Sequence, residues 1–169
     1  MGWWKRASKG SYYFRGPNPA VDLVAVRKKN SGDEILLIRR AEGATEGGKW
    51  ALPGGFINTD AKKGEEWREG RETPRAAAVR ETLEETGVSV DPSSLVEIGV
   101  FEGGGRDPRD SEEAWSKSYA FGALVEGDTR AAGGDDASDA RWFSVREIPP
   151  TAFDHHKIIS AGLRALGIG

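Results

Sequence analysis

The sequence predicts an α+β fold in which mixed strands are flanked by two helices. Three features support this class: an apolar hairpin pattern near the start, a sharply bounded helix in the middle and an apolar-periodic helix at the end. We find no internal repeat and no linker long enough to divide the 169 residues. We therefore expect one domain over residues 1–169.

The strands are predicted from short apolar runs separated by turn residues. Residues 21–27 and 34–40 form the expected hairpin, joined by the turn cluster "NSGD". The stretch "KWALPGGFI" is predicted to be extended, because Pro53 blocks a helix and the following glycines let the backbone approach a ligand. Further strands are expected at residues 95–101, 118–125 and 140–143.

The two helices have recognisable ends. Thr73 is suited to cap the central helix, Pro74 to occupy its first position and Gly87 to end it, which predicts a helix over residues 74–86. The segment "FDHHKIISAGLRAL" predicts the second helix, with Asp154 as its cap and apolar residues at helical spacing. Neighbouring histidines on such a helix point to different sides, so "DHHK" does not indicate a metal site.

The composition excludes several classes of function. The formal net charge is only −3, from 24 basic and 27 acidic residues, so no overall field attracts nucleic acid or an anionic membrane. The absence of cysteine excludes thiol nucleophiles and thiolate zinc sites and fits a reducing compartment. No apolar run approaches membrane length. We expect a cytoplasmic protein with no nucleic-acid or membrane partner.

The stretch "RETLEETG" carries the strongest chemical signal. Glu81, Glu84 and Glu85 lie three and four residues apart and therefore share a helix face. Such a patch is usually only solvated, but these glutamates lie towards the helix C-terminus, where the macrodipole favours cations. Mg²⁺ or Mn²⁺ would offset them, because both cations take carboxylate and carbonyl oxygens and share their coordination with substrate phosphates.

Together with Gly55 and Glu72, the run "RETLEETGV" resembles the Nudix box, G-x5-E-x7-R-E-U-x-E-E-x-G-U, and "WALPGG" before it is similar to the same family. The resemblance implies an α/β/α sandwich with a mixed sheet between helices. The sequence departs from the pattern in two places. Thr82 stands where the pattern has a bulky apolar residue. Residues 56–71 separate Gly55 from Glu72, where the pattern has only five residues, which places an insertion at about residues 59–71. The insertion is either a lid or partner surface, or a solvated decoration.

The resemblance also implies roles for particular residues. Glu81 and Glu85 would be the main ligands of Mg²⁺, or alternatively Mn²⁺, with Glu84 assisting and the Gly54 carbonyl completing the shell. Arg80 and Glu72 would brace the helix against the loop. The metals would neutralise the bridging phosphates while a positioned water attacks phosphorus in line.

Three further stretches, "RGPNPAVD", "RDPRDSEEAW" and "GDDASDARWF", are similar to segments of mitochondrial-type ADP-ribose pyrophosphatases and of the related domain of an ADP-ribose-gated cation channel. This resemblance implies hydrolysis of ADP-ribose to AMP and ribose 5-phosphate. The expected substrate contacts are Arg40, Trp50, Asp107, Arg109 and Trp115. Each tryptophan is also suited to plain core packing.

Several alternatives stay open at this stage. For the general base we place Asp135 and Asp136 first, ahead of Glu112, Glu113 and the box glutamates Glu84 and Glu85. The function is either hydrolysis of ADP-ribose, binding of ADP-ribose without cleavage, or removal of pyrophosphate from modified nucleoside triphosphates. The partner is expected to be a small nucleotide, and a homodimer is also open.

Overall fold

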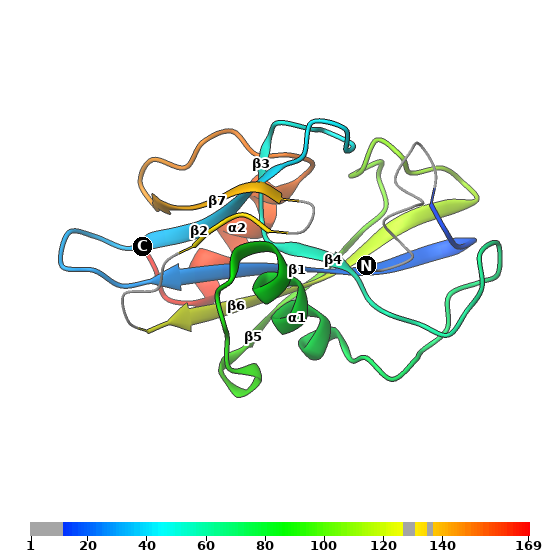
Figure 1. Cartoon of the computed structure of the whole chain (residues 1–169), viewed down its shortest axis with the longest axis horizontal. Coiled ribbons are helices and arrows are strands. Elements are labelled where there is room, and N and C mark those ends of the chain that lie inside the picture. The colour runs from blue at the N-terminus through cyan, green and yellow to red at the C-terminus, as the bar shows by residue number, and fades with distance from the viewer. Residues whose placement is uncertain (1–11, 127–130, 135–136) are drawn as a thin grey trace.

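The computed structural model describes residues 12–126, 131–134 and 137–169 (Figure 1). Its elements, in chain order, are β1 (Gly16–Arg27), β2 (Glu34–Arg40), β3 (Trp50–Ala51), β4 (Gly54–Phe56), α1 (Pro74–Thr86), the short 3-10 helix η2 (Pro92–Ser94), β5 (Val96–Glu102), β6 (Ala114–Val125), β7 (Ala137–Ser144) and α2 (His155–Ala165). Within the described ranges, no helix has both the length and the apolar character needed to cross a membrane.

The strands form one mixed sheet with the order β3-β2-β1-β6-β5, to which β4 is added on β1 and β7 on β2. At its centre, β1 and β6 pair in parallel from Gly16 opposite Ala114 to Arg27 opposite Val125. All other pairings between these strands are antiparallel. Figure 1 shows α1 in front of the sheet and α2 behind it, so the predicted α/β/α sandwich is confirmed.

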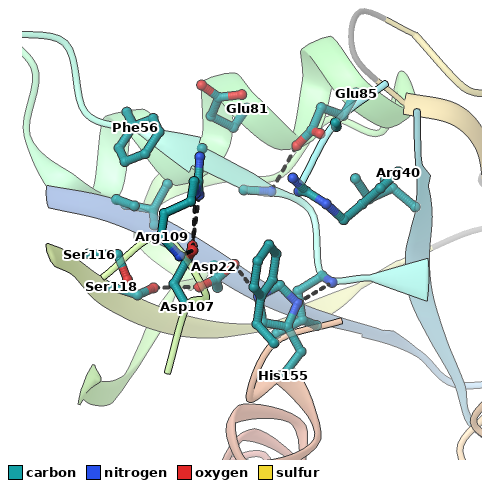
Figure 2. Close-up of a pocket in the computed structure, with 18 of the residues that line it drawn as sticks. Asp22, Arg40, Phe56, Glu81, Glu85, Asp107, Arg109, Ser116, Ser118 and His155 are labelled. Atoms are coloured by element: carbon teal, nitrogen blue, oxygen red, sulfur yellow. Dashed lines mark hydrogen bonds and ion pairs between the residues drawn. The ribbon is translucent and has the colours of Figure 1, made fainter. Parts of the chain in front are cut away.

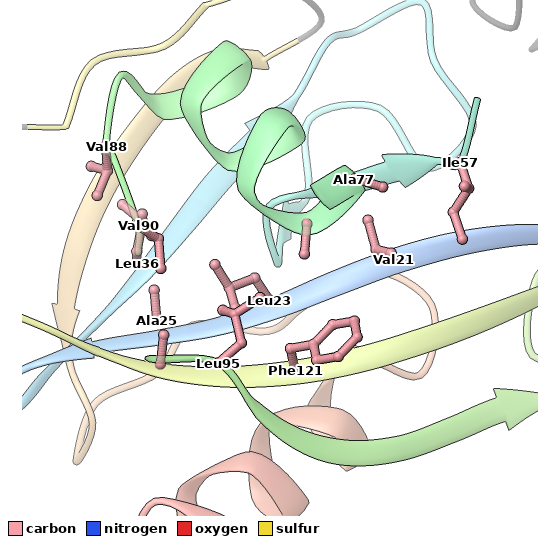
Figure 3. Close-up of a cluster of buried hydrophobic side chains, with 12 residues drawn as sticks. Val21, Leu23, Ala25, Leu36, Ile57, Ala77, Val88, Val90, Leu95 and Phe121 are labelled. Carbon is pink, nitrogen blue, oxygen red and sulfur yellow. The ribbon is translucent and has the colours of Figure 1, made fainter. Parts of the chain in front are cut away.

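Alternate residues of β1 serve the two faces of the sheet, as the strand period of two requires. Leu23 packs with Ala77 of α1 in one buried cluster, which Figure 3 shows. Val24 packs with Ile158 and Ile159 of α2 in a second cluster on the opposite face. The continuous apolar run of β1 therefore reflects a strand that is buried on both sides.

The bounds of α1 agree with the sequence because its signals are local. The Thr73 hydroxyl accepts a hydrogen bond from the Ala76 amide at 3.2 Å, and Gly87 ends the helix in the left-handed conformation with φ of 72°. Thr82, at the position expected to be apolar, is fully buried, and its hydroxyl donates to the Ala78 carbonyl at 2.8 Å. Thr82 therefore needs no partner outside its own helix.

The prediction that the Asp154 side chain caps α2 is wrong. Asp154 stands at the N-cap position but makes no side-chain hydrogen bond to the helix. Its carboxylate instead accepts two hydrogen bonds from Arg106, at 3.0 and 2.7 Å. A charged bidentate pair is stronger than a bond to a neutral backbone amide, so a residue from a distant loop replaces the local cap.

The sheet is more extensive than the apolar runs predict. β1 begins at Gly16 and β6 at Ala114, so both include polar residues or prolines that precede the apolar runs. Their hydrogen bonds go to each other, and a backbone ladder requires no apolar pattern. The outer strand β5 spans Val96–Glu102 and β7 spans Ala137–Ser144, one to three residues from the predicted ends.

The insertion is an ordered loop between β4 and α1 that pairs with the segment before β1. The Gly64 amide donates to the Tyr13 carbonyl, and the Arg15 amide donates to the Glu65 carbonyl, both at 3.0 Å. Trp67 of this loop is half-buried against the core cluster under α1. The loop therefore contributes packing to the domain.

Deleting residues 60–70 should lower the melting temperature by about 2–8 °C. Losing a half-buried tryptophan contact costs on the order of 1–2 kcal/mol, and each kcal/mol shifts the midpoint by about 2–4 °C in a domain of this size. Thermal unfolding measures the change. Trp67→Ala should account for most of it, whereas Glu69→Ala, at an exposed position in the same loop, should not. An unchanged midpoint in the deletion variant would make the loop a decoration.

Candidate active site

A cavity of about 300 Å³ opens between α1, the β1–β4 pair and the loops around residues 40–44, 106–109 and 153–155. Figure 2 shows glutamates from α1 on one side of it and, facing them, Arg40 from the end of β2 and Arg109 from the loop between β5 and β6. Its polar side chains are Asp22, Arg40, Glu81, Glu85, Arg106, Asp107, Arg109, Ser116, Ser118 and His155. Of the residues predicted from sequence, the cavity thus brings together Gly54, Glu81, Glu85, Arg40, Asp107 and Arg109.

Two of the three box glutamates face this cavity from α1. The side chains of Glu81 and Glu85 are almost wholly buried, with 1% and 6% of each residue exposed. Glu85 Oε1 accepts a hydrogen bond from the Gly54 amide at 2.8 Å. A Cβ on Gly55 would lie 2.5 Å from the Glu81 carboxyl carbon, so only glycine leaves room for that carboxylate. The glycine pair therefore lets β4 approach the acidic helix closely.

Arg80 ties α1 to the loop before it. Its guanidinium binds the Glu72 carboxylate through Nε at 2.6 Å and Nη2 at 2.8 Å, and it also donates to the Phe56 carbonyl at 3.2 Å. Glu72 accepts from the Asn58 amide at 2.9 Å. Burial alone would raise the pKa of Glu72, but Arg80 and Asn58 hold it below its ordinary value of 4.5.

Acid should weaken this brace. A carboxyl whose folded pKa is depressed stabilises the fold above its unfolded pKa and loses that contribution as pH falls through the folded pKa. Glu72→Gln should therefore lose less free energy of unfolding than the wild type between about pH 5 and pH 3. Urea unfolding at several pH values measures both curves. Parallel curves would mean that Glu72 does not contribute in this way.

Glu84 does not line the cavity, unlike the other two box glutamates. It is exposed, and its carboxylate lies 3.3 Å from Arg80 Nη1 rather than in the cavity. Across the described ranges, no three acidic, histidine or cysteine side chains are gathered closely enough to hold a metal ion. Arg80 Nη1 instead contacts both Glu81 Oε1, at 2.9 Å, and Glu84 Oε2. The role of Glu84 as a metal ligand stays a prediction.

The donors that do face the cavity fit a hard divalent cation. The Leu23 amide donates to the Pro53 carbonyl, and the Ile57 amide donates to the Pro19 carbonyl. Hydrogen-bonded and non-hydrogen-bonded pairs alternate along an antiparallel ladder, so Asp22 and Gly54 form a non-hydrogen-bonded pair. The polar backbone groups of Gly54 therefore point away from β1, towards the helix that carries Glu85. Two buried carboxylates beside one backbone carbonyl form an all-oxygen donor set, as Mg²⁺ and Mn²⁺ prefer.

Three arginines supply positive charge on the other side of the cavity. Arg106 is paired with Asp154, and Arg109 binds both oxygens of Asp107 at 3.0 and 2.7 Å. Arg109 also lies 5.1 Å from the centre of the Tyr12 ring and 5.9 Å from that of Phe56, which both hold it in place. Burial would raise the pKa of Asp107, but Arg109 keeps it below its usual value.

Arg40 differs from the other two arginines. Its Nε donates to the Thr45 carbonyl at 2.7 Å, and its guanidinium lies 4.8 Å from the centre of the Phe153 ring. No described residue accepts a hydrogen bond from its two terminal amino groups. Burial and the neighbouring charge of Arg109 lower the pKa of Arg40, yet an arginine stays protonated at neutral pH. The two terminal amino groups of the Arg40 guanidinium are thus left as hydrogen-bond donors at the cavity.

A buried polar network that the sequence did not reveal lies under the cavity. His155 is 5% exposed, and its Nδ1 accepts from the Leu52 amide at 2.9 Å. Its Nε2 lies 3.3 Å from Asp22 Oδ1, while the Ser118 hydroxyl donates to Asp22 Oδ2. Burial lowers the pKa of His155 below its ordinary value of 6.5, so the ring is neutral near pH 7. Its neighbour His156 is exposed.

The remaining predicted residues lie outside this cavity. Trp50 packs edge-on against Phe143 with ring centres 4.8 Å apart, and the Trp115 indole donates to Glu102 at 3.1 Å. Neither tryptophan lines the cavity, nor does Glu112 or Glu113; its aromatic lining comes from Phe56 and Phe153.

Asp135 and Asp136 lie outside the described residues. The segment that leads to them is placed, since the Gly134 amide donates to the Glu85 carbonyl at 3.0 Å. The chain therefore reaches the end of α1 just before these two aspartates.

The fold and the cavity together define a class of protein, an α/β/α sandwich in which an acidic helix faces basic loops across a small-molecule site. The chain belongs to the NUDIX family, whose domain it matches over residues 16–162. It is a hydrolase of that family, as the sequence predicted.

Particular relatives support this assignment. The chain is 36% identical over 147 residues to the ADP-ribose pyrophosphatase of Methanocaldococcus jannaschii, which covers 87% of this chain and 75% of that protein. The NUDIX domain of Shewanella oneidensis NrtR, solved with ADP-ribose, shares the fold with a TM-score of 0.73 at 24% identity, over 89% of both chains.

A bifunctional NMN adenylyltransferase/ADP-ribose pyrophosphatase from Francisella tularensis, solved with AMP and manganese, has a TM-score of 0.64 at 25% identity. It matches 89% of this chain and 42% of its own length.

Proposed function

We propose that this protein is a divalent-metal-dependent hydrolase that splits ADP-ribose into AMP and ribose 5-phosphate. The observation that carries the proposal is the cavity in which buried Glu81 and Glu85 face the donor fork of Arg40. The similarity to the archaeal ADP-ribose pyrophosphatase supports ADP-ribose as the substrate.

The charges of the cavity suit a pyrophosphate bridge. Mg²⁺ is the metal we propose, with Mn²⁺ as a substitute, held by Glu81, Glu85 and the Gly54 carbonyl. When bound, the metal neutralises phosphate charge and lowers the pKa of a coordinated water. The protein's own residues then hold the substrate, because Arg40 can donate two parallel hydrogen bonds to phosphate oxygens.

The wall opposite the glutamates suits a sugar. Asp107 and Ser116 both line the cavity and are buried, and carboxylate and hydroxyl groups accept hydrogen bonds from sugar hydroxyls. Phe56 and Phe153 offer the aromatic surfaces at the cavity for the adenine ring. For the general base we keep Asp135 and Asp136, with Glu85 as the alternative that lies at the cavity.

Arg40→Lys should raise KM for ADP-ribose by about tenfold and change kcat less. Lysine keeps the charge but loses the planar fork, and the loss of one charge-assisted hydrogen bond costs roughly 1.4 kcal/mol. Steady-state kinetics measures both constants. Arg39→Lys is the matched control, because Arg39 is exposed on the same strand and does not line the cavity. Equal effects of the two substitutions would argue against Arg40 as a phosphate ligand.

The proposal is tested by product analysis of the purified protein with Mg²⁺. The panel contains ADP-ribose, ADP-glucose, NADH, diadenosine compounds and nucleoside triphosphates, with Glu85→Gln as the control for contaminating hydrolases. We expect AMP and ribose 5-phosphate, formed fastest from ADP-ribose. Pyrophosphate released from triphosphates would instead indicate a nucleotide-cleaning enzyme. Binding of ADP-ribose without cleavage would indicate a sensor, and either result would reject the proposal.

A further inference from the structure

The tripeptide Leu52–Pro53–Gly54 joins β3 to β4 and carries the carbonyl that we propose as a metal ligand. Proline has no amide hydrogen, so this segment has only two backbone donors. The Gly54 amide donates to Glu85 of α1 at 2.8 Å, and the Leu52 amide donates to His155 of α2 at 2.9 Å. Each of the two backbone donors is therefore bound by a side chain from a different helix.

Strand β1 also binds the Leu52–Gly54 segment. The Leu23 amide donates to the Pro53 carbonyl at 3.0 Å, and Gly54 lies opposite Asp22 in the β1–β4 ladder. The contact is so close that a Cβ on Gly54 would lie 2.0 Å from the Val21 carbonyl oxygen. Contacts to β1, α1 and α2 thus hold the segment together.

The hydrogen bond that His155 accepts from Leu52 defines its tautomer. Because Nδ1 accepts from an amide, the ring proton of the neutral imidazole lies on Nε2. That nitrogen faces Asp22 Oδ1 at 3.3 Å, and the other oxygen of Asp22 is bound by Ser118. A carboxylate oriented in this way holds the imidazole in the form that accepts from Leu52.

We infer that His155, oriented by Asp22, is a positioning residue that holds the Leu52–Gly54 segment so that the Gly54 carbonyl and the Glu85 carboxylate face one metal ion. His155 acts through the Leu52 amide and does not itself touch the reacting atoms. The inference rests on the metal site of the proposed function but not on the identity of the substrate.

Two substitutions separate the two polar contacts of His155, the hydrogen bond from Leu52 and the contact with Asp22. Asparagine carries an oxygen on its γ carbon, as histidine carries Nδ1, so His155→Asn can still accept from Leu52 but does not reach Asp22. Glutamine reaches Asp22 with its amide but has no acceptor at the δ position, so His155→Gln loses the bond to Leu52. His156→Ala is the matched control, because His156 is the exposed next residue of the same helix.

The first measurement is Mn²⁺ binding without substrate, from the electron paramagnetic resonance signal of free Mn²⁺. We expect His155→Gln to weaken Mn²⁺ binding by about tenfold, since partners that orient metal ligands typically contribute 10–100-fold in affinity. We expect His155→Asn and His156→Ala to bind within about twofold of the wild type. Hydrogen exchange of the Leu52 amide, followed by NMR, should be fast only in the glutamine variant.

Several results would overturn the inference. One is normal Mn²⁺ affinity in His155→Gln despite fast exchange at Leu52. Another is unchanged Mn²⁺ binding in both variants with a raised KM, which would make His155 a substrate contact. If the glutamine variant does not fold, His155→Asn still decides, because weak Mn²⁺ binding with a protected Leu52 amide would contradict the proposed role.

The outcome is separable from that of the proposed function. If the wild type does not cleave ADP-ribose but Mn²⁺ binding follows the expected pattern, only the substrate assignment fails. If the wild type binds no Mn²⁺, the metal site and this inference fail together.

Discussion

Replacing Glu85 with glutamine should lower kcat/KM by about a thousandfold while the protein stays folded. Glu85 is buried beside the cavity and is proposed as a ligand of the catalytic metal. Losing a metal ligand removes several kcal/mol of transition-state stabilisation, and roughly 4 kcal/mol corresponds to a thousandfold change in rate. The glutamine oxygen can still accept from the Gly54 amide, so the contact between β4 and α1 is retained.

The matched comparison is Glu84→Gln, which makes the same chemical change one residue away. Glu84 is exposed and bound to Arg80 outside the cavity, so we expect a smaller loss, of about tenfold or less. Steady-state hydrolysis assays with Mg²⁺, together with thermal unfolding, measure both variants. Near wild-type turnover in Glu85→Gln would exclude it as a metal ligand, and equal losses would return Glu84 to the metal set.

Gly54→Ala should destabilise the fold, whereas Gly55→Ala should mainly reduce activity. A Cβ on Gly54 would lie 2.0 Å from the backbone oxygen of Val21, and the central strand cannot move aside. We expect Gly54→Ala to cost about 3 kcal/mol of stability, which lowers the melting temperature by roughly 6–12 °C. Activity should fall with it, because β4 must separate from β1.

Gly55→Ala should instead inactivate a stable protein. Its Cβ would meet the carboxyl group of Glu81, the nearest atom being the carboxyl carbon at 2.5 Å. The far end of a side chain can move away at little cost in stability, but Glu81 then leaves the metal site, so we expect at least a hundredfold lower kcat, roughly 3 kcal/mol.

Calorimetry and kinetics on both variants test the contrast, with Gly43→Ala as the stability control because nothing lies within 4 Å of its added methyl. Identical melting temperatures for Gly54→Ala and Gly55→Ala would contradict this account.

The parts of the fold that the sequence predicted correctly depend on neighbouring residues. The helix over 74–86 is bounded by Thr73, Pro74 and Gly87, all of which act within one turn. The strand at Glu34–Arg40 is bounded by a turn cluster and a glycine-rich loop. The beginnings of β1 and β6 were not predictable in this way, because each is defined by the other strand, which is distant in the sequence.

The same distinction applies to the candidate site. Glu81, Glu85 and Gly54 were found because a compact motif holds them together, and Arg109 because it lies in the recognisable segment "RDPRDSEEAW". His155 gave no such signal, since its partners Leu52 and Asp22 belong to other parts of the chain. Trp50 was ambiguous because tryptophans pack in cores and stack on bases with the same surface, and only the position of Phe143 shows which contact it makes here.

The parallel pairing of β1 with β6 has a consequence for the order in which the molecule forms. Strands joined across so much intervening chain pair late, because closing a long loop costs entropy before any contact repays it. During synthesis on the ribosome, residues 16–27 of β1 cannot pair with β6 until residues 114–125 have emerged. His155 emerges later still, so a nascent chain should acquire its anchored Leu52 amide only after α2 has been synthesised. Truncated translation products that lack α2 are therefore expected to bind the metal ion more weakly, even when they contain the whole acidic helix.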